Sequence, residues 1–202
     1  MSRIVVSQFV TVDGVVEGPG NEPDFDRAGW AFQFDRGDEG NRYKLEEVFG
    51  AGALLLGRVT YEGFAAVWPS MTDEVGFADK MNTMPKYVVS STLAEPGWAN
   101  STVLSGDVAD EVEKLKRRDS GDILVNGSIQ LVRTLAEHGL VDEYRLMVFP
   151  IVVGAGRRLF GDTDQVATLR LVEAKPVGPD GVAVLTYRPA GTTEPATAGP
   201  GT

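Results

Sequence analysis

The chain has 202 residues, of which 43% are apolar and 24% charged, a balance typical of one globular domain with a full hydrophobic core. Nineteen basic and twenty-nine acidic residues give a net charge of -10, which repels nucleic-acid phosphates and anionic membrane surfaces. The sequence has no cysteine and one histidine, which excludes disulfides, thiolate catalysis, cysteine-ligated zinc and two-histidine metal sites. We therefore expect no metal, no nucleic-acid partner and no membrane partner.

The apolar segments are short, and this favours a cytoplasmic protein. The longest apolar run, 146–153, has a proline inside it and is far shorter than the roughly 20 residues that span a bilayer. Residues 1–3 lead directly into the short apolar segment 4–6, which is too short for the apolar core of a secretion signal.

Hydrophobic periodicity, with glycine and proline between segments, predicts strands and helices that alternate along the chain. The glycine-rich, aromatic stretch 15–41 is expected to be a long loop, which is either a lid or pocket wall or a loop that its aromatic residues simply anchor. The predicted elements, in chain order, are a strand at 4–10, a short helix near 26–34, a helix at 43–49, a strand at 53–56, a helix from about 58 or 60, strands at 86–90 and 102–104, a helix at 107–118, a strand at 123–125, a helix at 128–138, and strands at 144–149, 169–174 and 182–187.

The order of these elements predicts an α/β fold, a three-layer sandwich around a mixed, mainly parallel sheet. Pro179-Asp180-Gly181 is a turn sequence, so we expect the last two strands to form an antiparallel hairpin. Residues 1–188 contain no repeat or linker and are expected to form one domain. Residues 189–202 consist of Pro, Gly, Ala, Thr and one Glu, and they are predicted to be a disordered tail.

One strand-to-helix junction has the composition of a phosphate site. In Gly57-Arg58-Val59-Thr60, the glycine allows close approach to the backbone where a helix presents free N–H groups. Arg58 adds a forked cation and Thr60 a hydroxyl. The alternative for this motif alone is a plain turn in which Thr60 is the helix N-cap.

A second junction of the same kind is Asn126-Gly127-Ser128-Ile129, where Gly127 clears space and Ser128 can cap the following helix. Because the carboxyl ends of parallel strands meet at one edge of a sheet, the two glycine turns are expected to lie side by side. Two helix N-termini in that position could hold one diphosphate between them.

A third strand end, Ser90-Ser91-Thr92, offers three consecutive hydroxyls at the same edge, which suits a ribose or its phosphate. Each of the three segments is unremarkable alone. Their expected coincidence at one sheet edge is what indicates a ligand site.

The segment 150–160 is a weaker signal, because Gly154 and Gly156 lack the third glycine of a dinucleotide fingerprint. It either lines a site, together with Pro150, or is a flexible connector with two surface arginines, Arg157 and Arg158.

Taken together, these motifs resemble the dihydrofolate-reductase-like family, in the branch similar to the reductase domain of the bifunctional riboflavin-biosynthesis deaminase-reductase. The resemblance covers roughly residues 3–188, and the motifs occur in the family's order. The segments that carry it are 12–14, 54–62, 88–92, 123–129, 149–150 and 154–156.

The resemblance implies that NADPH binds across the strand ends. It places the segment 57–60 by the cofactor phosphates with Arg58 toward the adenosine, the segment 90–92 near the adenosine ribose, and the segment 126–129 at the diphosphate. The deaminase half of the bifunctional enzyme needs a zinc site with cysteines, so only reductase chemistry is expected here.

The leading hypothesis is an NADPH-dependent reductase that transfers a hydride to a C=N or C=O bond of a small heterocyclic or sugar-linked substrate. Trp30, Phe34 and Tyr61 are candidate pocket walls that could stack on a flat ring. In a riboflavin-pathway substrate, Arg157 or Arg158 could meet the phosphate.

Dihydrofolate reductases place a carboxylate on the first helix to steer a proton, and spacing does not choose among the aspartates near that place. The candidate acids retained are Asp13, Asp35 and Glu62.

Two alternatives remain, reduction of a dihydropterin, which requires a buried carboxylate beside the ring, and a non-catalytic nucleotide-binding dimer. The resemblance also implies a homodimer, as is common in the family. Its interface would be the edge of the last hairpin or the helix faces.

Overall fold

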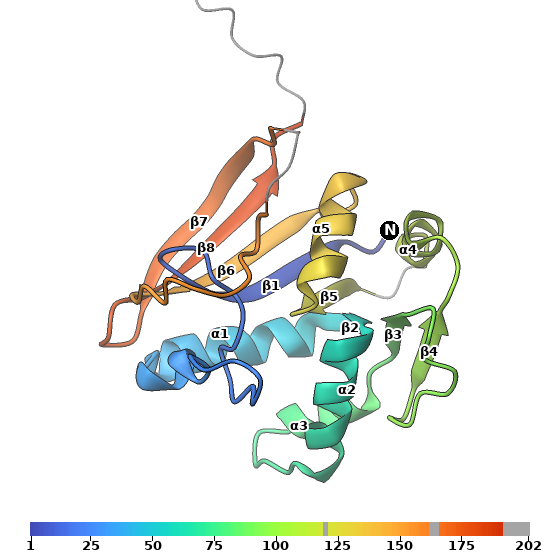
Figure 1. Cartoon of the computed structure of the whole chain (residues 1–202), viewed down its shortest axis with the longest axis horizontal. Coiled ribbons are helices and arrows are strands. Elements are labelled where there is room, and N and C mark those ends of the chain that lie inside the picture. The colour runs from blue at the N-terminus through green and yellow to red at the C-terminus, as the bar shows by residue number, and fades with distance from the viewer. Residues whose placement is uncertain (119–120, 162–165, 192–202) are drawn as a thin grey trace, which may run out of the picture.

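The computed structural model describes residues 1–118, 121–161 and 166–191, and its centre is an eight-stranded sheet of order β4-β3-β2-β5-β1-β6-β8-β7 (Figure 1). The strands from β4 to β6 are parallel, whereas β8 and β7 are antiparallel to their neighbours. The strands are β1 Ile4–Thr11, β2 Ala51–Gly57, β3 Lys86–Val89, β4 Ser101–Leu104, β5 Asp122–Asn126, β6 Glu143–Phe149, β7 Leu169–Val177 and β8 Val182–Pro189.

Helices cover both faces of the sheet, which confirms the predicted three-layer α/β fold. Alternate residues of each strand face opposite layers. Val6 and Val125 pack with α4 and α5, whereas Val5 and Leu124 pack with α1, α2 and α3. The helices are α1 Gly37–Gly50, α2 Arg58–Val67, α3 Phe77–Thr83, α4 Val108–Lys116 and α5 Ile129–Glu137, with short 3-10 helices at Trp30–Gln33 and Trp68–Ser70.

The last two strands form the predicted antiparallel hairpin, and its turn holds the start of α1. Asp35 donates its backbone N–H to the Asp180 carboxylate at 2.6 Å. Gly178 has a φ of +68°, and a Cβ there would lie 2.3 Å from the carbonyl carbon of Arg36, so only glycine fits this close approach.

Helix α1 begins six residues before the predicted start at 43, because Gly37 and Gly40 resemble loop residues in the sequence. Gly40 in fact allows the helix to approach β7: a Cβ there would lie 3.2 Å from Val177 Cγ2. Helix α3 was not predicted. Its short length hides its periodicity, and Asp73 supports its start by accepting the backbone N–H groups of Phe77 and Ala78.

The C-terminal boundary also differs from the prediction. Strand β8 continues to Pro189, and Ala190 donates its N–H to the Thr168 carbonyl at 2.9 Å, so the hairpin takes up the first residues of the expected tail. The rest of that tail, 192–202, lies outside the described residues. In the described ranges, no helix has the length and apolar character needed to cross a membrane.

Candidate functional site

The two glycine turns meet at the carboxyl edge of the sheet, where β2 and β5 are parallel neighbours. Gly57 donates its backbone N–H to Ser128 Oγ at 2.7 Å. A Cβ on Gly127 would lie 3.0 Å from Thr60 Cγ2, and a Cβ on Gly57 would lie 3.3 Å from Ser128 Oγ. The turns therefore lie side by side, as the sequence predicted, and α2 and α5 start from the same place.

Neither helix start carries the side-chain cap that the sequence suggested. Gly57 occupies the N-cap position of α2, so the reading of Thr60 as N-cap is wrong. Ser128 is at the N-cap position of α5, but its hydroxyl accepts the Gly57 N–H instead of an N–H of its own helix. The backbone of Ser128 is in the left-handed conformation, with a φ of +63°. Because no side chain caps them, the first-turn N–H groups of both helices are available to an anion.

Arg58 and Glu62 lie one turn apart on α2 and form an ion pair at 2.9 Å. Both side chains are roughly half exposed. Glu62, a candidate acid, is therefore an exposed partner of Arg58 at the start of the helix. Since exposed ion pairs are weak, the guanidinium can exchange Glu62 for an anion at little cost.

The third strand end also lies on this edge, because Val89 is the register partner of Gly57. Ser90 closes a tight turn: its Oγ accepts the backbone N–H groups of Thr92 at 3.1 Å and Leu93 at 3.0 Å. Ser91 and Thr92 are exposed. The edge thus presents the exposed side chains of Ser91 and Thr92 beside the glycine turns, with the Thr92 hydroxyl 3.4 Å from Ser90 Oγ.

Asp13 joins the loop after β1 to the loop after β6. Its carboxylate accepts hydrogen bonds from Thr11 Oγ1 at 2.6 Å, Gly154 N–H at 2.8 Å and Val153 N–H at 3.2 Å. The Thr11 hydrogen bond is the main cause that lowers the pKa of Asp13, and the two backbone N–H groups add to it. An acid held ionised in this way is a poor proton donor, so the geometry favours a loop-fastening role for Asp13.

The same two loops meet at further points. Arg157 pairs with Glu17 at 2.8 Å, and Arg158 donates Nε–H to the Asp13 carbonyl at 3.0 Å. Gly156, with φ +107°, lies where a Cβ would be 3.0 Å from Phe25. Pro150 and Gly154 are exposed on this loop. The segment 150–158 is therefore held by contacts with the first loop and exposes both arginines, and its role in lining a site stays a prediction.

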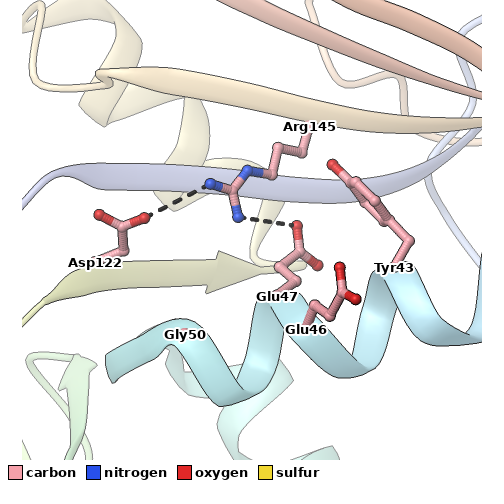
Figure 2. Close-up of a pocket in the computed structure, with 6 residues that line it drawn as sticks. All are labelled: Tyr43, Glu46, Glu47, Gly50, Asp122 and Arg145. Atoms are coloured by element: carbon pink, nitrogen blue, oxygen red, sulfur yellow. Dashed lines mark ion pairs between the residues drawn. The ribbon is translucent and has the colours of Figure 1, made fainter.

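The sequence reasoning missed a polar pocket of about 230 Å³ between α1 and the sheet, called here the α1 pocket (Figure 2). Glu47 is buried at its centre and accepts hydrogen bonds from Ser7 Oγ, at 2.7 Å, and from the ammonium of Lys44. The sequence does contain a signal for this pocket. Lys44 and Glu47 are spaced so that they share one face of a helix, and the strands that this face meets carry polar residues among apolar ones. The α1 pocket is lined by Tyr43, Glu46, Glu47, Gly50, Asp122 and Arg145.

Residues 2–183 match the model of the RibD C-terminal domain family. The chain belongs to the RibD C-terminal domain family. Protein YyaP of Bacillus subtilis (strain 168) is 31% identical over 177 residues, which are 86% of this chain and 88% of YyaP.

Solved structures agree on the fold of this RibD C-terminal domain. A putative riboflavin biosynthesis protein from Shewanella sp. PV-4 has a TM-score of 0.73 at 17% identity and covers 94% of this chain and 99% of its own. Dihydrofolate reductase from Enterococcus faecalis, complexed with NADP(H), has a TM-score of 0.58 at 14% identity, with 93% and 96% covered. The dihydrofolate-reductase-like fold expected from the motifs is thereby confirmed.

Two aromatic candidates of this RibD-type domain belong to its core. Trp30 is 1% exposed, packs edge-on against Phe149 and donates its indole N–H to the Glu17 carbonyl at 2.8 Å. Tyr61 is 2% exposed, and its hydroxyl accepts the backbone N–H of Trp98 at 2.9 Å. Protein covers both rings, so the prediction that they stack on a ligand is wrong. Phe34 is only half-buried and remains a candidate wall.

Asp35 is exposed and accepts the Gly37 N–H at 2.7 Å, which supports the first turn of α1. Its geometry explains a structural role, and its proposed acid role stays a prediction. Across the residues that the structure describes, no group of three or more His, Asp or Glu side chains is arranged to hold a metal ion.

Proposed function

We propose that this RibD C-terminal domain is an NADPH-dependent reductase that resembles 5-amino-6-(5-phosphoribosylamino)uracil reductase of riboflavin biosynthesis. The observation that carries the proposal is the contact between the two uncapped helix starts, where Gly57 N–H meets Ser128 Oγ at 2.7 Å. Family membership supports it, and so does the shared fold of a dihydrofolate reductase that binds NADP(H). When bound, the nicotinamide would supply the hydride.

The residues at the carboxyl edge fit a dinucleotide. Gly57 and Gly127 occupy positions where a larger side chain would contact the neighbouring turn. The uncapped N–H groups at the starts of α2 and α5 lie close to each other at this edge. That arrangement suits a diphosphate, which needs several N–H donors and a positive helix dipole. Arg58 adds a cation for a further phosphate, and Ser91 and Thr92 add hydroxyls for a ribose.

The protein's own contribution to the reaction is to position and enclose the reactants. The fastened loops 12–17 and 150–158 form a fixed wall beside the sheet edge. Phe34 contacts Phe149 edge to face at 5.9 Å and gives an apolar surface for a flat ring. Arg157 and Arg158, both exposed, are the proposed partners of a substrate phosphate.

Reduction of a dihydropterin is less well supported. It requires a buried carboxylate beside the ring, and the α1 residue that qualifies is Glu47. Glu47, however, is 1% exposed, and its carboxylate already accepts hydrogen bonds from Ser7 Oγ and the Lys44 ammonium, so it is not free to hold a ring N–H group.

Arg58→Ala tests the cofactor assignment. We expect saturable quenching of tryptophan fluorescence by NADPH, and a roughly tenfold weaker NADPH affinity in the variant, because one charge-assisted contact is worth about 1.5 kcal/mol. NADH affinity should change less if Arg58 contacts the extra phosphate. Arg117→Ala, at an exposed arginine in the C-cap position of α4, is the matched control.

Absence of saturable binding of either nucleotide would rule out the reductase. NADPH binding without oxidation by any flavin-pathway or pterin substrate would instead favour a non-catalytic nucleotide-binding protein.

We also propose a homodimer through β7. This strand is at the edge of the sheet, and Leu171 and Val172 are about half exposed on it. An unpaired edge strand can extend its sheet with a second copy. Antiparallel pairing centred on Ala174 places Glu173 opposite Lys175 of the partner subunit, which matches opposite charges.

Light scattering after size-exclusion chromatography tests this interface. We expect a dimer at micromolar concentration and a monomer for Leu171→Lys, which puts a charge into the pairing edge. A monomeric native chain at 100-fold higher concentration would contradict the proposal.

A further inference from the structure

A glutamine interrupts the apolar face of β1. Val6 and Val10 of this strand pack with α4 and α5, and Gln8 lies between them on the same face, with only 5% of its surface exposed. A buried amide is costly unless it is hydrogen-bonded. Gln8 Nε2 donates to the Gly127 carbonyl at 3.1 Å, so its partner is the second glycine turn.

This turn is bonded to strands on both sides. In the sheet, β5 lies between β1 and β2. Gln8, on β1, binds the Gly127 carbonyl, and Gly57, the last residue of β2, donates its N–H to Ser128 Oγ at 2.7 Å. Gly127 and Ser128 both have positive φ values, +69° and +63°. A serine rarely adopts this conformation, so the contacts around it must hold it, and strained residues of this kind cluster at functional sites.

The hydrogen bond from Gln8 sets the direction of the Ser128 N–H. The Gly127–Ser128 peptide is trans and planar, so the Gly127 C=O and the Ser128 N–H point in opposite directions. Because Gln8 holds the carbonyl on the side of β1, the N–H points away from β1, toward the side where α2 starts. This N–H has no hydrogen-bond acceptor among the residues that the structure describes. It is therefore available to a ligand at the junction of the two helix starts.

We propose that Gln8 is a positioning residue for the cofactor diphosphate. By fixing the Gly127 carbonyl, it aims the Ser128 N–H at a phosphate oxygen between the starts of α2 and α5, while Gln8 itself stays buried behind the turn. This inference rests on the proposed function, because it names a residue that prepares the proposed NADPH site before the cofactor binds. A donor that is already held in place binds more tightly, since binding then needs no ordering of the turn.

A purely structural role for Gln8 is the competing explanation, in which the hydrogen bond only satisfies a buried amide. The two roles differ in the ligands that they affect. The direction of the Ser128 N–H matters for a diphosphate. It does not matter for adenosine 2′-phosphate, which carries the adenosine and the extra phosphate of NADPH but no diphosphate.

Calorimetric titration of the native chain and of Gln8→Met with NADPH and adenosine 2′-phosphate separates these roles. Methionine has nearly the shape of glutamine and cannot donate to a carbonyl. We expect NADPH affinity to fall about tenfold, the value of one charge-assisted hydrogen bond, and adenosine 2′-phosphate affinity to stay within about twofold. Unchanged NADPH affinity in folded Gln8→Met, or an equal loss for both ligands, would overturn the inference.

Thr186→Val is the matched control. Like Gln8→Met, it replaces a buried polar side chain of a strand by an apolar one of similar shape, but on β8, which is not adjacent to β5. It should bind both ligands as the native chain does.

NMR of the nitrogen-15-labelled native chain gives a second test that needs no variant. We expect fast solvent exchange of the Ser128 amide hydrogen in the free chain, and a large shift of its resonance with strong protection when NADPH is added. NADPH binding that leaves this amide unshifted and unprotected would overturn the inference and leave the proposed reductase intact. Absence of NADPH binding would overturn both.

Discussion

Gly127→Val is expected to weaken NADPH binding by at least about 100-fold. Gly127 has a φ of +69°, and a Cβ there would lie 3.0 Å from Thr60 Cγ2. A branched side chain therefore forces the starts of α2 and α5 apart, so that their N–H groups no longer converge on one diphosphate. Loss of two charge-assisted hydrogen bonds, at about 1.5 kcal/mol each, accounts for this factor.

Fluorescence titration of folded protein measures the effect, with urea unfolding to confirm that the variant is native. Gly76→Val is the matched control, because Gly76 has a φ of +78° but its Cβ would be no closer than 3.8 Å to a neighbour. It carries the same backbone strain, about 1–3 kcal/mol, at a distance from the junction. Native affinity in a folded Gly127→Val protein would refute the paired-turn site.

Arg145→Leu is expected to lower the free energy of unfolding by about 3 kcal/mol. Arg145 bridges Glu143 at 2.8 Å, Asp122 at 3.6 Å and Glu47 at 3.7 Å. The Glu143 and Glu47 side chains are only 4% and 1% exposed. Removing the cation weakens the compensation of two buried carboxylates, which keep only Arg188 and Arg3 at Glu143 and Lys44 at Glu47, and this is more costly than loss of a surface pair.

Urea unfolding at neutral pH measures this loss, and Arg117→Leu is the control. Arg117 pairs with Glu113 on α4 with both side chains more than half exposed, so its loss should change stability by less than about 0.5 kcal/mol. Similar effects for the two variants would show that the Arg145 network contributes no more than a surface pair.

The pH dependence gives a second readout of the same network. Burial alone would raise the pKa of Glu143, but hydrogen bonds from Arg188 and Arg145 outweigh it and hold the pKa below the usual 4.5. The unfolded chain therefore takes up this proton first, and stability present above pH 4.5 is lost as the pH falls through the folded pKa. Arg145→Leu should lose less stability than the native chain between pH 6 and 4, because one cause of the shift is gone.

The meeting of the two glycine turns at the carboxyl edge could be predicted because its signals are local. Apolar runs at 53–56 and 123–125 identify buried strands, and Gly57 and Gly127 mark their ends. Parallel strands then bring these ends to one edge of the sheet. The roles of the hydroxyls could not be predicted in the same way: the Ser128 Oγ bonds to Gly57, a residue 71 positions away, instead of to its own helix.

The α1 pocket escaped prediction because its buried surface is polar. Gly40 and Glu47 replace the apolar stripe by which an amphipathic helix is recognised. Their burial depends on partners from distant strands, Ser7 on β1 and Arg145 on β6.

The sequence by itself determined the α/β alternation, the final hairpin and the meeting of the two glycine turns, since periodicity and glycine positions express local backbone preferences. Tertiary structure decided which polar and aromatic side chains are buried or exposed. It placed Trp30 on Phe149, Tyr61 against Trp98 and the Asp13 carboxylate on the backbone at 153–154. The physical reason is that the fate of a side chain depends on contacts with residues far along the chain, and residue type alone does not encode them.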